Sequence, residues 1–125
     1  MQNTKLLLKF QIVINMVHIN NQNFPAVYLT SPEEKLKGMM GRDSLEGCMV
    51  FNMGKGFHSF WMKNTLIPLD IIFVNDKRIS NIHLNCQPGG RRMNPPSYTG
   101  IGNLVIEFPS GTCDNFKIGD KVSLY

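Results

Sequence analysis

The sequence lacks any long apolar run, and no stretch approaches the roughly 20 residues that a helix needs to cross a bilayer. It also has few cysteines, and an odd number of them without paired spacing argues against a secreted disulfide framework. The three are Cys48, Cys86 and Cys113. The apolar start around Leu6 is broken by Lys9 and Gln11, and no small-residue cleavage site follows. We therefore expect a cytoplasmic protein that does not associate with membranes.

No charge of either sign dominates the chain. Thirteen Lys and Arg residues against nine Asp and Glu residues give a net charge of +4, and the basic residues are spread along the sequence. A dedicated nucleic-acid-binding protein usually gathers its positive charge on one face, so specific nucleic-acid binding is not expected. The content of 42% hydrophobic and 18% charged residues is typical of a globular protein. A chain of 125 residues fits one domain that can bury a core without disulfides.

The motifs of catalysis and cofactor binding are missing as well. His18, His58 and His83 lie far apart, without the spacing of a metal site. No nucleophile elbow or local Cys–His signature is present. Gly54 and Gly56 lack the helix and the Lys-Ser/Thr pair that follow a phosphate-binding loop. The sequence therefore predicts no metal and no cofactor.

Most of the chain has the pattern of short strands separated by turn residues. We predict strands over residues 10–19, 24–29, 48–51, 59–62, 69–74, 78–84, 104–108 and 121–125. Residues 91–102, rich in Pro, Gly and Arg, are predicted to form one long irregular loop. The fold class is therefore mainly β, a single compact sandwich or partly closed barrel. Residues 1–15 are interpreted as an N-terminal extension that could add a strand, and residues 16–125 as the domain.

One short helix is predicted over about residues 32–40 and is expected to pack on the sheet. Ser31 can cap its first amides, Pro32 suits its first position, and Glu34 completes a capping box. Leu36 and Met39 then share one face of the helix. Glycines at positions 38 and 41 keep the helix short.

The run Phe60–Val74, FWMKNTLIPLDIIFV, is the most informative segment. It resembles the signature of a bacterial and archaeal family known as domain of unknown function 192 (DUF192). Further segments agree with that family in order and spacing: residues 33–45, 47–51, 105–111 and 118–122. The resemblance extends from Phe24 to the C-terminus and implies a compact, mainly β domain whose biochemical role is unassigned. The loop over residues 86–98 is longer and more basic than is usual in that family.

Two residues of this run invite both a structural and a functional interpretation. Burying the indole of Trp61 would contribute on the order of 4–6 kcal/mol as an upper bound, so core packing alone can explain it. Asp70 lies in an apolar strand, and a buried carboxylate requires a compensating partner. Lys63, Arg42 or the amides around Asn64 could supply that partner. Asp70 would then either fasten the loop before it to the sheet or form one wall of a polar pocket.

Two other positions are open in the same way. Glu107 lies between apolar residues and is either a second pocket carboxylate or the solvent face of its strand. Arg91 and Arg92 could contact phosphate, although a solvent-exposed loop explains them equally well.

We therefore predict a non-catalytic module that binds a small molecule or a protein through a polar patch. Its residues would be Arg42, Trp61, Lys63, Asn64 and Asp70. The first alternative is a small hydrolase-like enzyme that uses Asp70 with Lys63 or His58 as acid and base. The second is weak nucleic-acid binding through the loop that carries Arg91 and Arg92.

Overall fold

The computed structural model describes residues 15–125. The predicted N-terminal extension lies outside these residues except for its last position. The elements follow in the order β1 (Met16–Ile19), β2 (Gln22–Leu29), α2 (Pro32–Lys37), β3 (Cys48–Trp61), β4 (Leu69–Asn75), β5 (Arg78–Cys86), β6 (Ser97–Pro109) and β7 (Ser123–Leu124).

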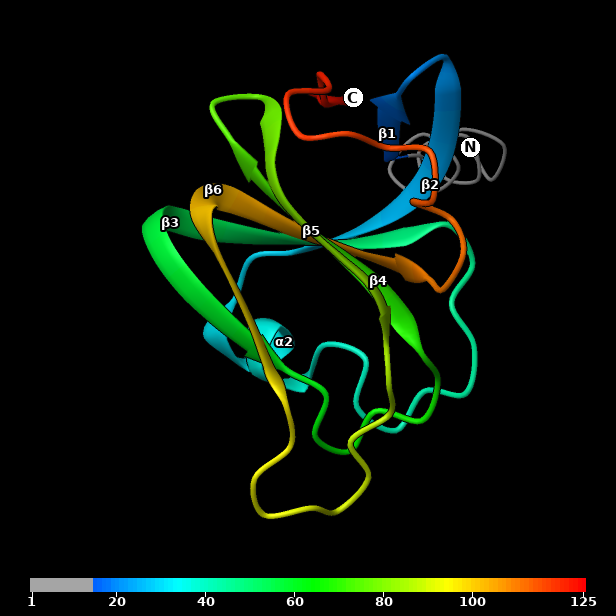
Figure 1. Ribbon diagram of the computed structural model, residues 1–125, viewed down its shortest axis with the longest axis vertical. Helices are drawn as coiled ribbons and strands as arrows, with labels where there is room; N and C mark the ends of the chain where they lie inside the picture. Colours follow the sequence, from blue (N-terminus) through cyan, green and yellow to red (C-terminus); the bar gives the residue numbers. More distant parts are fainter. Residues whose placement is uncertain (1–14) are drawn as a thin grey trace, which may run out of the picture.

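The strands form one curled sheet in the order β5-β4-β6-β3-β2-β1-β7 (Figure 1). An isolated bridge between Arg78 and Lys121 brings the start of β5 against the chain just before β7. This contact draws the two ends of the sheet together, which confirms the predicted partly closed barrel. All strand pairs are antiparallel except β2 and β3, which run parallel from the pairing of Ala26 with Cys48 onward.

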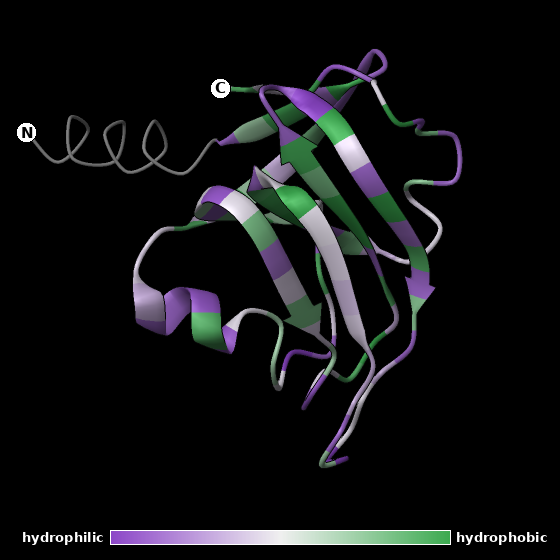
Figure 2. Cartoon of the chain, turned by 60° about the vertical axis from the view of Figure 1, so that its left-hand side comes forward, coloured by the Kyte–Doolittle hydropathy of each residue, from purple (hydrophilic) through white to green (hydrophobic). Residues whose placement is uncertain are grey.

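Helix α2 lies in the connection between these two parallel strands. The Ser31 hydroxyl accepts from the Glu34 amide and the Glu34 carboxylate accepts from the Ser31 amide, so the predicted capping box is present. The helix ends earlier than predicted because Gly38 has a φ of 44°, which leaves the right-handed helical region. Figure 2 shows α2 standing beside the sheet, with hydrophilic residues over much of its surface.

The sheet carries one apolar cluster on each face because successive side chains of a strand point to opposite sides. Ile72, Val74, Ile106 and Phe108 belong to the first cluster. The second cluster contains, among others, Leu29, Met39, Met49, Phe51, Met62, Leu69, Ile71, Phe73, Cys86 and Val105. Side chains at positions 70 and 107 consequently lie on different faces of the sheet.

Besides the helix end, two predicted boundaries in the sheet are wrong because of glycines inside strands. The separate strands predicted over residues 48–51 and 59–62 are parts of one strand, β3, with a register shift between Asn52 and Gly56. The predicted loop over residues 91–102 ends at residue 96, because β6 begins at Ser97. A Cβ on Gly102 would lie 2.2 Å from the Val74 carbonyl oxygen. This glycine therefore serves close packing of strands rather than a turn.

Gly102→Ala tests this close approach. Because the added methyl group would collide with backbone rather than with a flexible side chain, we expect a loss of about 2 kcal/mol or more in the free energy of unfolding. Urea denaturation followed by circular dichroism measures it. Gly54→Ala on β3 is the matched control, since its Cβ would meet no atom within 4 Å. Equal stability of the two variants would contradict the packing role.

None of the helices formed by residues 15–125 has the length and hydropathy that crossing a bilayer requires.

Candidate functional site

Asp70 is fully buried and accepts three backbone hydrogen bonds. Its Oδ1 accepts from the Asn85 amide at 2.8 Å, and its Oδ2 accepts from the amides of Gly111 at 3.0 Å and Cys113 at 2.9 Å. These donors belong to the end of β5 and to the turn after β6. The carboxylate thus ties three segments of the chain together, each far from the others in sequence.

The predicted partners of Asp70 are therefore wrong. Neither Lys63 nor Arg42 nor the amides around Asn64 compensate this carboxylate. All three donors lie C-terminal to the run Phe60–Val74, whereas the expected partners lie within it or before it. Asp70 is a fastener, but it holds the β5 end and the turn after β6 rather than the loop before it. Asp70 has no exposed surface and lines neither the cavity beside α2 nor the hollow near the C-terminus, so the hydrolase-like interpretation lacks the exposed acid that it requires.

A cavity of about 330 Å³ opens on the other face of the sheet, between α2, β3 and the loop after β3. Its wall is mostly apolar, and lysines and one acid supply the charged groups. The lining residues are Pro32, Lys35, Leu36, Lys37, Gly38, Met39, Met40, Phe51, Met53, Ser59, Phe60, Trp61, Lys63, Thr65 and Glu107. An apolar pocket with a few converging polar groups is the usual form of a small-molecule site.

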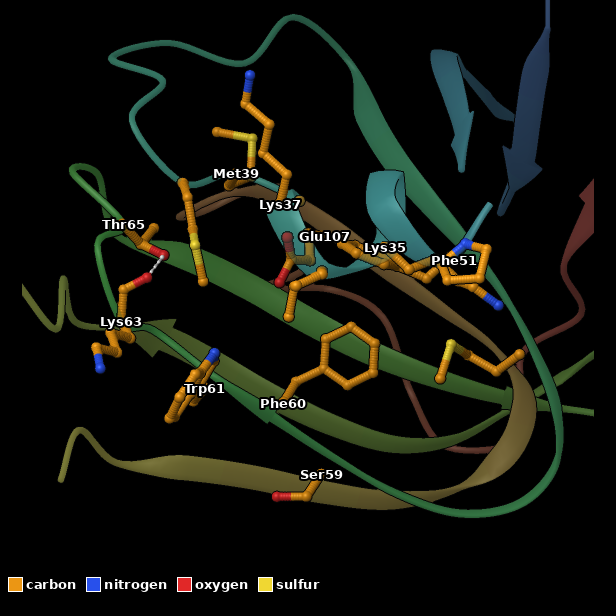
Figure 3. Close-up of a pocket in the computed structure, with 15 residues that line it drawn as sticks. Lys35, Lys37, Met39, Phe51, Ser59, Phe60, Trp61, Lys63, Thr65 and Glu107 are labelled. Atoms are coloured by element: carbon orange, nitrogen blue, oxygen red, sulfur yellow. Dashed lines mark hydrogen bonds between the residues drawn. The ribbon is translucent and has the colours of Figure 1, made fainter. Parts of the chain in front are cut away.

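Glu107 is the buried polar group of this cavity. Its register partners are Met49 on β3 and Ile71 on β4, and only 4% of its surface is exposed. Its carboxyl group makes no hydrogen bond with the described residues, and burial raises its pKa to about 8. Figure 3 shows the carboxyl group pointing into the space between Lys37, Met39 and Phe60. Of the two interpretations open at this position, the pocket carboxylate agrees with the geometry.

The wall opposite the helix is positioned by backbone hydrogen bonds. Asn64, with a φ of 56°, donates its amide to the Gly90 carbonyl at 2.7 Å and accepts from the Gly41 amide at 3.0 Å. The Met62 carbonyl accepts from the Gly89 amide at 2.8 Å. The loop after β3 is thereby clamped between the turn after α2 and the segment before β6. Lys63 is presented at the cavity on a fixed backbone.

Trp61 and Lys63 lie together at the cavity. The Lys63 ammonium lies 5.2 Å from the centre of the Trp61 ring, within the range of a cation–π interaction. Trp61 is 44% exposed, so core packing, the structural interpretation of this residue, does not account for its place. Its exposed indole offers an aromatic face to a bound molecule.

The five predicted patch residues do not form one cluster. Trp61 and Lys63 line the cavity, whereas Arg42 and Asn64 are exposed and lie outside its lining. Asp70 lies on the other face of the sheet. The residues that the sequence prediction missed are Lys35, Lys37, Phe51 and Phe60. The pairing of Leu36 with Met39 was the available signal, since both residues line the cavity, although Leu36 is 72% exposed and Met39 lies beyond the end of α2.

A second hollow of about 470 Å³ lies near the C-terminus, lined by residues of β6 and of the chain from Lys121 to Leu124. Asn103 contributes a buried amide oxygen without a hydrogen bond in the described structure. No carboxylate and no aromatic side chain lines this hollow. The cavity with Glu107 is therefore the stronger candidate.

The groups that could perform catalysis are poorly placed for it. Burial raises the pKa of the Cys48 thiol to about 12 and that of the Cys86 thiol to about 11, which disfavours the nucleophilic thiolate. Within residues 15–125, no three His, Cys, Asp or Glu side chains are grouped to hold a metal ion. His58 bonds the Gly54 carbonyl and does not line the cavity.

Comparison with known proteins gives a family but no activity. The family model described as "DUF192: Uncharacterized ACR" matches residues 13–124. The crystal structure of a protein of unknown function from Novosphingobium aromaticivorans DSM 12444 is 33% identical, with a TM-score of 0.75 over 87% of this chain and 82% of that one. A putative transcription regulator from Sinorhizobium meliloti 1021 is 22% identical, with a TM-score of 0.75 over 87% and 90%. No curated protein matches the chain.

Proposed function

Because the chain belongs to the DUF192 family, whose description names no activity, we propose from the cavity itself that the protein is a non-catalytic module that binds a small organic molecule. The observation that carries this proposal is an unpartnered, almost fully buried carboxyl group that points into an apolar cavity. An unpaired buried polar group is costly in a native fold unless it has a use. A bound molecule would supply the missing hydrogen bond.

The predicted patch is narrowed by this proposal to the residues that line the cavity. Trp61 and Lys63 remain, and Glu107 joins them. Asn64 contributes through its backbone, which holds Lys63 in place, and Arg42 is left outside the binding surface. Asp70 contributes only by stabilising the sheet from its other face.

A panel of metabolites tests the proposal by thermal shift, followed by NMR titration of each hit. Trp61→Ala and Lys63→Ala are each expected to lower the affinity for such a hit about tenfold. The melting temperature of each variant should stay close to that of the wild type. The unchanged stability follows from the exposure of Trp61. Arg42→Ala, a cation just beyond the cavity, is the matched control and should leave affinity unchanged. Hits that perturb only amides remote from Glu107 and Trp61 would contradict the site.

The location of the protein in the cytoplasm stays a proposal. It is supported by the cysteines, since Cys48, Cys86 and Cys113 are all free and buried. Free thiols are typical of a reducing compartment.

Weak nucleic-acid binding through Arg91 and Arg92 also stays a prediction. Both side chains are exposed in the turn that follows Gly90. Within residues 15–125, neither side chain makes a hydrogen bond or ion pair that would fix it in place for a phosphate group. Exposure to solvent explains both residues, so we do not adopt this function.

A further inference from the structure

The acidic and basic groups of the cavity lie in different places, the acid at its inner end and the lysines at its opening. Glu107 is the buried acid, and the lining cations are Lys35, Lys37 and Lys63. The Lys35 ammonium already donates one hydrogen bond, to the Asn52 carbonyl at 3.1 Å, and is therefore less available to a ligand. Lys37 is exposed and Lys63 is half-buried over the Trp61 ring. The cavity therefore offers an ionisable acid inside and positive groups outside.

We propose that the ligand is a zwitterionic amino carboxylate whose ammonium group meets Glu107 while its anionic group lies among Lys37 and Lys63. This inference rests on the proposed function and names the ligand class of the same site. It follows from charge complementarity, since a molecule with the opposite arrangement of charges would place its ammonium group among the lysines and meet repulsion there. A purely anionic ligand would satisfy the lysines but would bring no cation to the acid at the inner end of the cavity.

The composition of the wall favours an ammonium group over a hydroxyl at the inner end. Phe51, Phe60 and Trp61 line the cavity beside Glu107, and aromatic faces attract cations. A hydrogen bond between two ionised groups is roughly twice as strong as a neutral one. An ammonium group offers three donors to a carboxyl group that has none from the protein. The aliphatic part of the ligand would contact Met39 and Met53.

Binding of this kind is linked to proton release. With the pKa of Glu107 raised to about 8, its carboxyl group is mostly protonated at neutral pH in the free protein. When the ammonium group binds, Glu107 gives its proton to the solvent and the ammonium–carboxylate pair remains. Affinity should therefore increase as the pH rises toward 8, since only the ionised fraction is competent to bind.

Other titratable groups near Glu107 must be separated from this effect. They are the lysines of the cavity and, on β5, Cys86 and His83. The Cys86 thiol stays neutral because its pKa is raised to about 11. His83 bonds the Thr99 carbonyl at 2.7 Å and packs against Phe73. A Glu107→Gln variant retains all of these groups and isolates the acid.

The experiment uses straight-chain ω-amino carboxylates of four to eight carbons as probes, titrated by NMR at pH 6, 7 and 8. The comparison probes are the ω-hydroxy carboxylates, the unsubstituted carboxylates and the alkylamines of equal length. We expect the amino carboxylates to bind most tightly at pH 8, about tenfold or more above their affinity at pH 6. In Glu107→Gln this pH dependence should disappear, and the preference for amino over hydroxy should be lost.

The outcomes separate this inference from the proposed function. Hydroxy or unsubstituted carboxylates that bind the cavity as tightly as the amino carboxylates would overturn the ligand class but retain the site. The same pH dependence in Glu107→Gln would show that another group titrates and would overturn the role of Glu107. If no probe shifts the NMR signals of the cavity residues while a metabolite of another class does, the ligand class proposed here is wrong and the proposed function stands. Failure of the whole metabolite panel at the cavity would reject the site itself.

Discussion

Asp70→Ala is expected to lower the free energy of unfolding by about 4 kcal/mol, the largest destabilisation by any single substitution considered for this protein. The change leaves the amides of Asn85, Gly111 and Cys113 without an acceptor inside the fold. Each buried amide that loses its partner costs about 1–3 kcal/mol. Urea denaturation at neutral pH, followed by far-ultraviolet circular dichroism, measures the loss.

Asp70→Asn separates the carboxylate charge from its shape. The amide side chain keeps one acceptor oxygen and puts a donor where Oδ2 now accepts from Gly111 and Cys113, so we expect an intermediate loss. Asp43→Ala, which removes an exposed carboxylate from the loop after α2, is the control and should be neutral. If Asp70→Ala were as stable as this control, the fastening role of Asp70 would be refuted.

Glu107→Gln is expected to change how stability depends on pH. The pKa of Glu107 rises from an ordinary 4.5 to about 8 in the folded protein, so the folded state holds a proton that the unfolded state releases between these values. The contribution of Glu107 to wild-type stability should therefore be fully present below about pH 4.5, decrease as the pH rises, and be lost above about pH 8. The pKa difference of about 3.5 units at about 1.4 kcal/mol per unit makes this fall on the order of 5 kcal/mol.

The glutamine variant removes this contribution because its side chain does not ionise. Glu107→Gln and the wild type should be about equally stable at pH 4.5, and the variant should be the more stable one at pH 9. Denaturation midpoints across this range give the difference at each pH. Glu46→Gln, in an exposed loop, should follow the wild-type profile throughout. Parallel curves for the wild type and Glu107→Gln would show that Glu107 is not held in its neutral form.

Local patterns in the sequence predicted the elements that depend on neighbouring residues. The capping box of Ser31 and Glu34 marked the start of α2, and the apolar run after Pro68 marked β4. The glycines of β6 could not be interpreted in this way. Gly100 is needed because a Cβ there would lie 2.4 Å from the Phe73 ring, and that contact links residues far apart in sequence.

The candidate site depends even more on distant contacts. The donors to Asp70 follow it by 15, 41 and 43 residues, so no local pattern could name them. Glu107 was ambiguous because alternation along a strand shows that two faces exist without showing which one meets the helix. The pairing of Glu107 with Met49 and Ile71 settles its face. Trp61 and Lys63 were predicted because aromatic and charged residues crowd into one short turn of the sequence.

The parallel pairing of β2 with β3 has a consequence for how this binding site can diversify. Two parallel neighbours require a crossover segment, and here that segment carries α2, which supplies one side of the cavity. The hydrogen-bond ladder of the barrel does not include the helix. Substitutions in the crossover can therefore reshape ligand selectivity while strand registry is preserved, which makes α2 the natural place to engineer a different specificity.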